Sequence, residues 1–218
     1  METKQIAFWG MEYYDIIINL ACIIAYTNKR ILIIDLSDNL SLKYSIQQPE
    51  DLEIGLFTTR IPNVDYTQLY ESKKLLLYDY VFVYFGRRVD ECDMKEFDVT
   101  ILLLDQQIYN VLQFNQTKFK SKMILLTINE AIDYKIGTTY LENQLNQKVE
   151  SSFLIHIDDV NKIQRLNYLY NQKISIRKFS GEYRKMIFEI AKVLSFDCEP
   201  KKLIKKAFKA VKRGRFQS

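Results

Sequence analysis

The sequence predicts an α/β domain, a doubly wound, mostly parallel sheet with helices on both faces, followed by a C-terminal amphipathic basic helix. Short runs rich in β-branched and aromatic residues alternate with helical patterns, as in a series of right-handed βαβ units. These runs are apolar at nearly every position, which is typical of parallel strands covered on both faces. Residues 201–218 stand apart because they contain eight basic residues and no acidic one.

Six segments have the composition of buried strands, and apolar residues three and four positions apart predict helices between and after them. The predicted strands are residues 5–9, 30–36, 80–85, 99–104, 122–128 and 152–157. The predicted helices are residues 15–28, 66–76, 107–116, 134–147, 160–170 and 181–195. Residues 38–64 hold Pro49 and Pro62 and have only weak periodicity, so we expect them to be irregular.

The chain is predicted to form one domain, residues 1–199, and a tail, residues 200–218. A length of 218 residues allows a sizeable core, and 48% hydrophobic with 27% charged residues is an ordinary globular composition. Three scattered cysteines exclude a disulfide scaffold and predict a reduced, cytoplasmic environment. The longest uncharged apolar stretch, residues 16–26, is far shorter than the ~20 residues of a membrane span.

The link between the first strand and the first helix is where such folds usually bind a phosphate. A phosphate-binding loop needs glycines, so that successive backbone N–H groups can face the anion, and normally a lysine. This chain has six glycines, no G-x-G sequence and no lysine after a glycine. The link offers one glycine and two carboxylates in a degenerate loop: Gly10, Met11, Glu12, Tyr13, Tyr14 and Asp15. We therefore expect no bound nucleotide and no other cofactor.

The run KQIAFWG at residues 4–10, followed by NLACIIAYTNKRILIIDL at residues 19–36, nevertheless resembles the start of ParA/MinD-type P-loop ATPases, including the TadZ/CpaE branch associated with pilus assembly. In that family an apolar strand precedes K-G-G-x-G-K-[ST]-T, a helix carrying N-L-A, and a strand ending in I-D. Asn19-Leu20-Ala21 and Ile34-Asp35 match the two flanks. Between Ile6 and Asn19 the chain is about four residues shorter than the family pattern, so most of the phosphate loop is missing. The signature lysine and the magnesium-binding hydroxyl have no counterparts.

The resemblance covers most of residues 4–195. Residues 78–84 resemble the family's Y-D-Y-hydrophobic-D strand, with Tyr84 in place of the second, metal-associated aspartate. Residues 99–114 and 122–137 resemble later strand–helix units, and residues 152–170 resemble a strand ending near Pro-x-Asp followed by a helix. The resemblance implies the family's P-loop fold. Family members dimerise across the nucleotide, so the missing loop leaves open whether this chain dimerises or pairs with an intact ATPase relative.

No residue is predicted to be catalytic and no metal site is predicted. His156 is the only histidine and lies in an apolar strand, and the cysteines lack C-x-x-C spacing. Asp35 and Asp38 are interpreted as polar residues near a strand end rather than as remnants of catalytic carboxylates. An enzymatic alternative places a ligand near Asp35, Tyr84 and Asp105, because open α/β sheets bind ligands at the carboxyl ends of strands. An open pocket with a perturbed carboxylate would favour it, and a pocket plugged by Tyr13 and Tyr14 would not.

The tail separates its residue types cleanly when it is placed on a helix. Its apolar residues fall within an arc of ~160° and its basic residues fill the opposing ~140°, as in helices that lie on anionic lipid. The tail also resembles the membrane-targeting helix that ends MinD-type proteins. The alternatives are that its apolar face docks onto the body, or that its lysines contact nucleic-acid phosphates. The predicted membrane-binding residues are Lys201, Lys202, Leu203, Ile204, Lys205, Lys206, Phe208, Lys209, Val211, Lys212 and Arg213.

These observations lead to one hypothesis and two alternatives about function. The hypothesis is a non-catalytic ParA/MinD-like pseudo-ATPase at the inner face of the cell membrane. It would be a scaffold or positioning factor for protein partners in a bacterial pilus or secretion assembly. The alternatives are a DNA-binding partition or regulatory factor that uses the basic tail, and an enzyme with a ligand site at the strand ends.

Overall fold

The computed structural model describes residues 2–46, 55–71, 75–88, 96–117, 120–121, 123–130, 138–156, 159–171, 175–195 and 200–213. The first part of the predicted helix 134–147 and the end of the tail, residues 214–218, lie outside these ranges. No helix within the described ranges is both long and apolar enough to cross a bilayer.

The described residues contain a central eight-stranded sheet with the strand order β10-β9-β7-β1-β5-β2-β4-β3. Neighbouring strands pair in parallel except β3 with β4, which pair antiparallel at one edge. The predicted mostly parallel sheet is confirmed. Its strands are β1 (Lys4–Gly10), β2 (Ile31–Asp35), β3 (Phe57–Thr58), β4 (Val64–Thr67), β5 (Tyr80–Tyr84), β7 (Val99–Asp105), β9 (Ile124–Glu130) and β10 (Ser151–His156).

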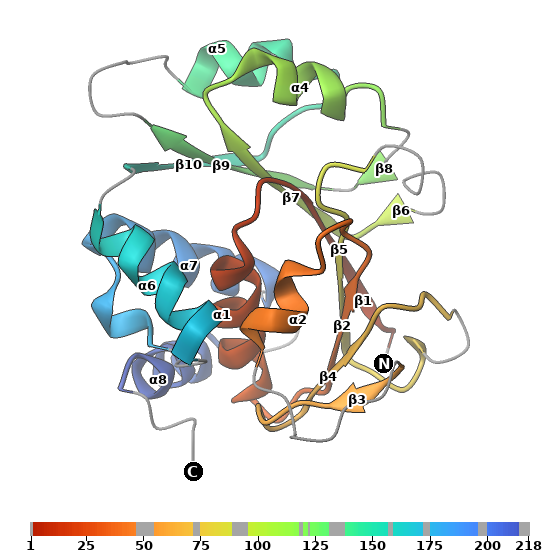
Figure 1. Ribbon diagram of the computed structural model, residues 1–218, viewed down its shortest axis with the longest axis vertical. Coiled ribbons are helices and arrows are strands. Elements are labelled where there is room, and N and C mark those ends of the chain that lie inside the picture. Colours follow the sequence, from red (N-terminus) through yellow and green to blue (C-terminus); the bar gives the residue numbers. More distant parts are fainter. Residues whose placement is uncertain are drawn as a thin grey trace.

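Helices cover both faces of this sheet, as predicted (Figure 1). One face carries α4 (Ile108–Phe114) and α5 (Thr138–Gln144). The other face carries α1 (Tyr14–Ala25), α2 (Ser41–Ser45), α6 (Asp159–Asn171), α7 (Gly181–Leu194) and α8 (Lys201–Lys212). A short 3₁₀ turn, η2 (Ile176–Lys178), lies between α6 and α7 in the chain.

Two hydrophobic cores explain why the strands are apolar at almost every position. Along β1, Ile6 and Phe8 belong to the core on the α1 side, and Ala7 and Trp9 belong to the core on the α4 side. The Trp9 and Phe114 rings pack with their centroids 5.3 Å apart. Because successive side chains of a strand point to opposite faces, a sheet covered on both faces needs apolar residues at both sets of positions.

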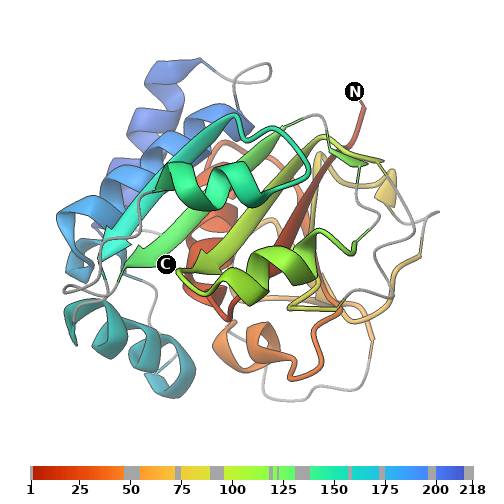
Figure 2. The same ribbon diagram turned by 90° about the horizontal axis from the view of Figure 1, so that it is seen from above.

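All twelve residues of α1 are buried. The sheet lies on one side of α1, and α2, α7 and α8 contact it from other sides. Figures 1 and 2 show α6 and α8 farther from the sheet than α1, so this face of the sheet carries an inner and an outer layer of helices. The polar residues of α1 face this second layer rather than solvent.

The predicted helix over residues 66–76 is wrong in its first part. Tyr66 and Thr67 belong to β4, which extends the sheet beside β2, and residues 68–71 form neither helix nor strand. A four-residue strand contains too few residues for its period of two to be recognised. The segment 38–64, predicted to be irregular, contains α2 and β3, and the short pair β6 (Glu96–Phe97) and β8 (Lys120–Ser121) was also missed.

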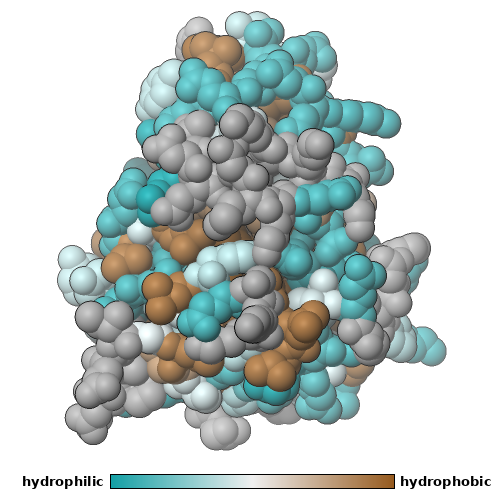
Figure 3. Space-filling model, turned by 90° about the vertical axis from the view of Figure 1, so that its right-hand side faces the viewer, coloured by the Kyte–Doolittle hydropathy of each residue, from teal (hydrophilic) through white to brown (hydrophobic). Residues whose placement is uncertain are grey.

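The side of the molecule that carries β3, β6 and β8 has both hydrophobic and hydrophilic residues on its surface. Hydrophobic residues appear there as separate spots among hydrophilic ones (Figure 3). Scattered exposed apolar residues are normal for a globular protein. The functional question therefore turns to two other places, the carboxyl edge of the sheet and the outer helical layer.

Candidate functional site

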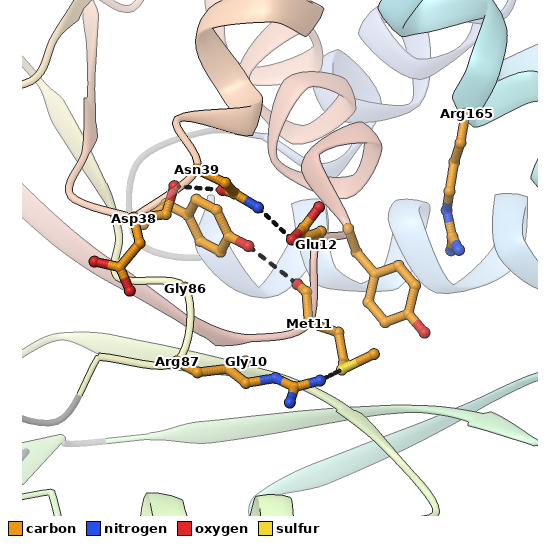
Figure 4. Close-up of a pocket in the computed structure, with 11 residues that line it drawn as sticks. Gly10, Met11, Glu12, Asp38, Asn39, Gly86, Arg87 and Arg165 are labelled. Carbon is orange, nitrogen blue, oxygen red and sulfur yellow. Dashed lines mark hydrogen bonds between the residues drawn. The ribbon is translucent and has the colours of Figure 1, made fainter.

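A cavity of about 630 Å³ opens at the carboxyl ends of β1, β5 and β2, three neighbouring strands of the sheet. This edge is where open α/β sheets bind ligands. The loops after these strands and one residue of α6 form its walls (Figure 4). The lining residues are Gly10, Met11, Glu12, Tyr13, Ser37, Asp38, Asn39, Tyr84, Gly86, Arg87 and Arg165.

The loop between β1 and α1 directs its backbone N–H groups into the fold. The amide of Gly10 donates to the Gly86 carbonyl oxygen at 2.7 Å, and the amide of Met11 donates to the Leu103 carbonyl oxygen at 2.7 Å. The amide of Tyr13 donates to the Met11 carbonyl oxygen at 2.8 Å. A phosphate loop works only when such groups face the anion. Three of them are therefore already engaged with backbone carbonyls.

Gly10 is required by the close approach of this loop to β7. Its φ angle is +122°, and a Cβ placed on it would lie 2.3 Å from the Leu103 carbonyl oxygen. Both facts exclude a larger residue without a backbone shift. The single glycine of the loop thus serves packing against β7.

A chain of side chains joins the loop to the end of β2. Glu12 accepts a hydrogen bond from the Asn39 amide, and Asn39 Oδ1 lies 3.1 Å from Ser37 Oγ (Figure 4). The Ser37 hydroxyl donates to Asp35 Oδ1 at 2.5 Å, and the amides of Ser37 and Leu42 donate to the Asp35 carboxylate. Burial raises the pKa of Asp35, although these hydrogen bonds act in the opposite direction. Asp35 therefore lies beneath the cavity and holds its wall in place.

The α6 side of the cavity is closed by a buried ion pair. Arg165 Nε donates to Asp15 Oδ1 at 3.0 Å, and the Arg165 guanidinium stacks over the Tyr13 ring at 4.0 Å from its centroid. Tyr14 donates its hydroxyl to the Arg165 carbonyl oxygen at 2.9 Å. Burial raises the pKa of Tyr13 to about 12. Arg165, an obvious cation for an anionic ligand, is thus bound by a carboxylate from the first turn of α1.

The opposite wall is formed by the end of β5. Tyr84 is buried and donates its hydroxyl to the Met11 carbonyl oxygen at 3.3 Å. Arg87 contacts the Met11 sulfur and lies over the Tyr109 ring at 5.9 Å from its centroid. Arg88 approaches Asp38 at 3.6 Å, and Asp38 is largely exposed. The lining therefore mixes two carboxylates with two guanidinium groups.

The structure brings together only part of the predicted site. Gly10 to Tyr13, Asp38 and Tyr84 line the cavity, whereas Asp35 lies beneath it and Tyr14 is turned toward α6. Asp105 lies apart, where it accepts hydrogen bonds from the Gln107 amide and the Asn110 side chain. Tyr13 and Tyr14 do not fill the pocket, and a carboxylate beside it has a raised pKa, so the observations expected of a ligand site are present in part.

Five lining residues were missed by the sequence interpretation: Ser37, Asn39, Gly86, Arg87 and Arg165. Arg165 and its partner Asp15 are 150 residues apart, and nothing in either local sequence indicates the pairing. Arg87 follows the family-like strand at residues 78–84 by three positions, so the end of that strand was the one available signal for it. Asn39 lies in the segment that was expected to be irregular.

The basic tail forms α8, and in this structure its apolar face is packed on the body. Ile204, Ala207, Ala210 and Val211 are buried against the α1 and α7 layer, and the Phe188 and Phe208 ring centroids are 5.1 Å apart. The expectation that Ile204 and Val211 face a membrane is therefore wrong for the docked helix. Burial against an existing hydrophobic core removes the same apolar area from water as lipid would.

The cationic face of α8 is exposed. Lys201, Lys202, Lys205, Lys206, Lys209 and Arg213 are exposed, and Leu203, Phe208 and Lys212 are half-buried. A depression of about 380 Å³ on this face is lined by Tyr26, Lys202, Lys205, Lys206, Lys209, Ala210 and Arg213. Because none of these lining residues is acidic, the depression favours an anion.

His156 ends β10 and is partly exposed, 3.8 Å from Glu182. Within the described part of the chain, no three His, Cys, Asp or Glu side chains are grouped closely enough to hold a metal ion.

Comparison with solved structures gives the class of the fold. The ParA family ATPase from Chlorobium tepidum TLS superposes with a TM-score of 0.52 at 11% identity, over 96% of this chain and 97% of that chain. The septum site-determining protein MinD from Pyrococcus horikoshii OT3, solved with Mg-ADP, gives a TM-score of 0.57 at 10% identity, over 91% and 100%. The chain therefore has a ParA/MinD-type P-loop fold, as its sequence resemblance implied. No protein-family model matches the sequence, and no curated protein does.

Proposed function

We propose that this chain is a non-catalytic ParA/MinD-like pseudo-ATPase of the TadZ/CpaE type. It acts as a scaffold or positioning factor in a membrane-associated bacterial assembly, with pilus or secretion machinery favoured. The observation that carries the proposal is the loop between β1 and α1, whose Gly10, Met11 and Tyr13 amides donate to carbonyl groups of the protein. These are the donors that a nucleotide phosphate would require.

The charges around the loop support the same proposal. Glu12 and Asp15 stand at the start of α1, where the helix dipole would otherwise favour a phosphate. The carboxylate of Asp15 is buried and paired with Arg165, so the protein itself supplies the anion at this end of the helix. An ATP phosphate would have to displace Asp15 and would meet the Glu12 carboxylate.

Nucleotide binding is tested by the thermal unfolding of the full chain with and without 1 mM ATP and Mg²⁺, together with isothermal titration. A ligand at 100 times its Kd stabilises a fold by about 2.7 kcal/mol, which moves the Tm by several degrees. We expect no shift and no binding heat. A cooperative unfolding curve shows that the sample is folded, and micromolar ATP binding would overturn the pseudo-ATPase proposal.

The membrane part of the proposal uses the exposed lysines of α8. Each basic residue near an anionic surface contributes about 1 kcal/mol, so four or five give a substantial attraction. Deleting residues 200–218 would also uncover α1, so substitution is the better test. A variant with Lys202, Lys205, Lys206 and Lys209 changed to Gln keeps the docked face and removes four charges.

Flotation with anionic vesicles should recover the native chain and lose the four-lysine variant. The same pair of proteins in a salt-titrated DNA shift tests the alternative of a DNA-binding factor, because phosphate contacts weaken steeply with salt. The DNA-binding alternative is favoured if the native chain shifts DNA, the four-lysine variant does not, and the native chain does not bind vesicles. As a scaffold, the chain would bind protein partners, and these include a second copy of the chain or an intact ATPase relative.

The cavity favours a second candidate, the binding of a small ligand at the strand ends. Its volume of about 630 Å³ is large enough for a small metabolite. Among the described residues, Arg87 contacts the Met11 sulfur and the Tyr109 ring rather than a buried carboxylate, which makes it the lining cation best placed to bind an anion. A thermal shift with a panel of carboxylate and phosphate metabolites, present in the native chain and absent in Arg87→Gln, would support this candidate. A shift that persists in Arg87→Gln would place the ligand elsewhere.

A further inference from the structure

Helix α6 has its polar and apolar faces reversed. Val160, Ile163, Leu166 and Tyr170 are 49%, 55%, 51% and 81% exposed, and they lie within ~120° on the helix. Asn161, Gln164 and Tyr168 are 3%, 9% and 1% exposed and lie on the opposite side with Arg165. A surface helix normally buries its apolar stripe and exposes its polar face. We call the four exposed residues the α6 stripe.

The inward polar face is held by hydrogen bonds to α1 and to the start of α7. Asn161 pairs with Ser180, the N-cap residue of α7, through contacts of 3.0 and 3.2 Å. Tyr168 donates its hydroxyl to Asn19 Oδ1 at 2.7 Å, and Asn19 Nδ2 donates to the Tyr183 hydroxyl at 3.0 Å. Buried polar groups with such partners fix a helix in one rotation. The α6 stripe is therefore held outward by the fold.

Helices α6 and α8, which carry the α6 stripe and the cationic face, cover the same face of the sheet (Figure 1). Both helices form the outer layer over α1, α6 near its first turns and α8 near Tyr26 at its end (Figures 1 and 2). The turn η2 contacts both helices. Its exposed Arg177 lines a second basic depression with Lys209, Lys212 and Arg213. The turn η2 thus links the helix that carries the α6 stripe to the helix that carries the cationic face.

We infer that this α6–α8 face is the surface that lies on an anionic membrane, with the α6 stripe inserted at the headgroup level. The inference rests on the membrane part of the proposed function. It differs in which helix enters the membrane, because the apolar anchor is α6 and α8 contributes only positive charge. An apolar stripe beside a cationic surface is the composition of interfacial helices. The only acidic residue in the α6 sequence, Asp159, is 3.6 Å from Lys162.

Charge distribution favours a bilayer over a protein helix as the occupant. Exposed cations are present on η2 and on α8, and along α8 they extend over residues 201–213, about 18 Å at 1.5 Å per residue. A partner helix in the α6 stripe would reach few of them at once, whereas a charged plane reaches all of them. Tyr170, the most exposed of the four, has the amphipathic ring that is enriched at membrane interfaces.

The first test compares two matched pairs of substitutions in the full chain. Ile163→Gln with Leu166→Gln removes apolar groups from the α6 stripe, and Ile108→Gln with Leu112→Gln removes the same residue types from α4, where they are 37% and 51% exposed. With vesicles of 30% phosphatidylserine, the α6 pair should weaken partitioning tenfold or more. The α4 pair should bind as the native chain does.

The second test reads insertion directly by fluorescence. The native Trp9 is fully buried and contributes a constant background. Tyr170→Trp should shift to the blue and be quenched by brominated lipid in anionic vesicles, whereas Tyr109→Trp on α4 should not. Equal behaviour of the two reporters would overturn the inference.

The outcomes separate this inference from the proposed function. If the four-lysine variant loses vesicle binding and the α6 pair does not, the membrane proposal stands and the α6 stripe is no anchor. If the native chain does not bind anionic vesicles at all, both the membrane part of the proposed function and the inference about α6 fail. Binding of an acidic amphipathic peptide that is lost in the α6 pair, with vesicle binding unchanged, would assign the face to a protein partner and overturn the inference.

Discussion

The carboxyl edge of the sheet and the outer α6–α8 face use their polar groups in opposite ways. At the edge, loop amides donate to backbone carbonyls, Asp35 accepts hydrogen bonds from Ser37 and Leu42, and Asp15 is paired with Arg165. On the outer face, lysines and apolar side chains point to solvent. In P-loop folds the edge is where the ligand binds. The contrast teaches that many polar groups at the edge have partners inside the protein, whereas the helical layer presents charged and apolar groups to solvent.

The largest effect should come from breaking the buried ion pair at the edge. Arg165→Met leaves the Asp15 carboxylate buried without its cation and should destabilise the fold by about 3–5 kcal/mol. Asp15→Asn in the same chain removes the charge and should restore much of that loss. Urea unfolding of both single variants and the double variant measures it. If Arg165→Met costs less than about 1 kcal/mol, the edge is not held together by this pair.

The docked face of α8 supplies the next largest effect. Ile204→Ala removes a side chain that is 1% exposed and should cost about 2–4 kcal/mol, because the cavity it leaves lies against the α1 layer. Lys205→Gln on the exposed side of the same helix is the control and should change stability by less than about 0.5 kcal/mol. Equal, small effects of both substitutions would mean that α8 leaves the body in solution, and the outer face would then present its apolar side too.

Sequence reasoning succeeded where one local pattern has one structural explanation. The continuous apolar runs predicted buried parallel strands because both faces of a sheet must be covered. Sequence reasoning failed where the interacting residue is remote in the sequence, as with Arg165 and Asp15, or where one pattern is compatible with two structures. The apolar face of α8 suits a protein core and a bilayer equally well, and only the body of the fold decides. The reversal of α6 depends on Asn19, which is 149 residues from Tyr168, and on Ser180, which is 19 residues from Asn161.

Gly10→Ala tests whether the loop at the edge is fixed by packing. The new Cβ would lie 2.3 Å from the Leu103 carbonyl oxygen at a φ of +122°, and we expect a loss of about 2–4 kcal/mol. Gly181→Ala, where a Cβ meets open space, is the matched control and should be nearly neutral. If Gly10→Ala leaves the Tm unchanged in thermal unfolding, the loop can open, and the contrast with the outer face is weaker.

The pKa of Asp35 adds a pH-dependent test of the edge. Burial raises the pKa of Asp35 above its value in the unfolded chain. The folded state therefore binds the carboxyl proton of Asp35 more tightly than the unfolded state does, and protonation stabilises the fold at low pH. That stabilisation is present below the unfolded pKa of about 3.9 and is lost as the pH rises through the raised value. Relative to Asp35→Asn, the native chain should lose stability over this rise, by about 1.4 kcal/mol for each pH unit that separates the folded and unfolded pKa values. A pH-independent difference would mean that the hydrogen bonds to Asp35 offset its burial, so that folding leaves its pKa unchanged.

The smallest effect on stability is expected on the outer face. Lys202, Lys205, Lys206 and Lys209 stand three and four positions apart on one side of α8, where like charges repel. Changing all four to Gln should therefore stabilise the fold slightly, by about 1 kcal/mol or less, and the gain should vanish at about 1 M salt because the charges are then screened. Urea unfolding at two ionic strengths measures this. A loss of stability instead would mean that the lysines hold α8 to the body, and the outer face would then be structural in the same way as the edge.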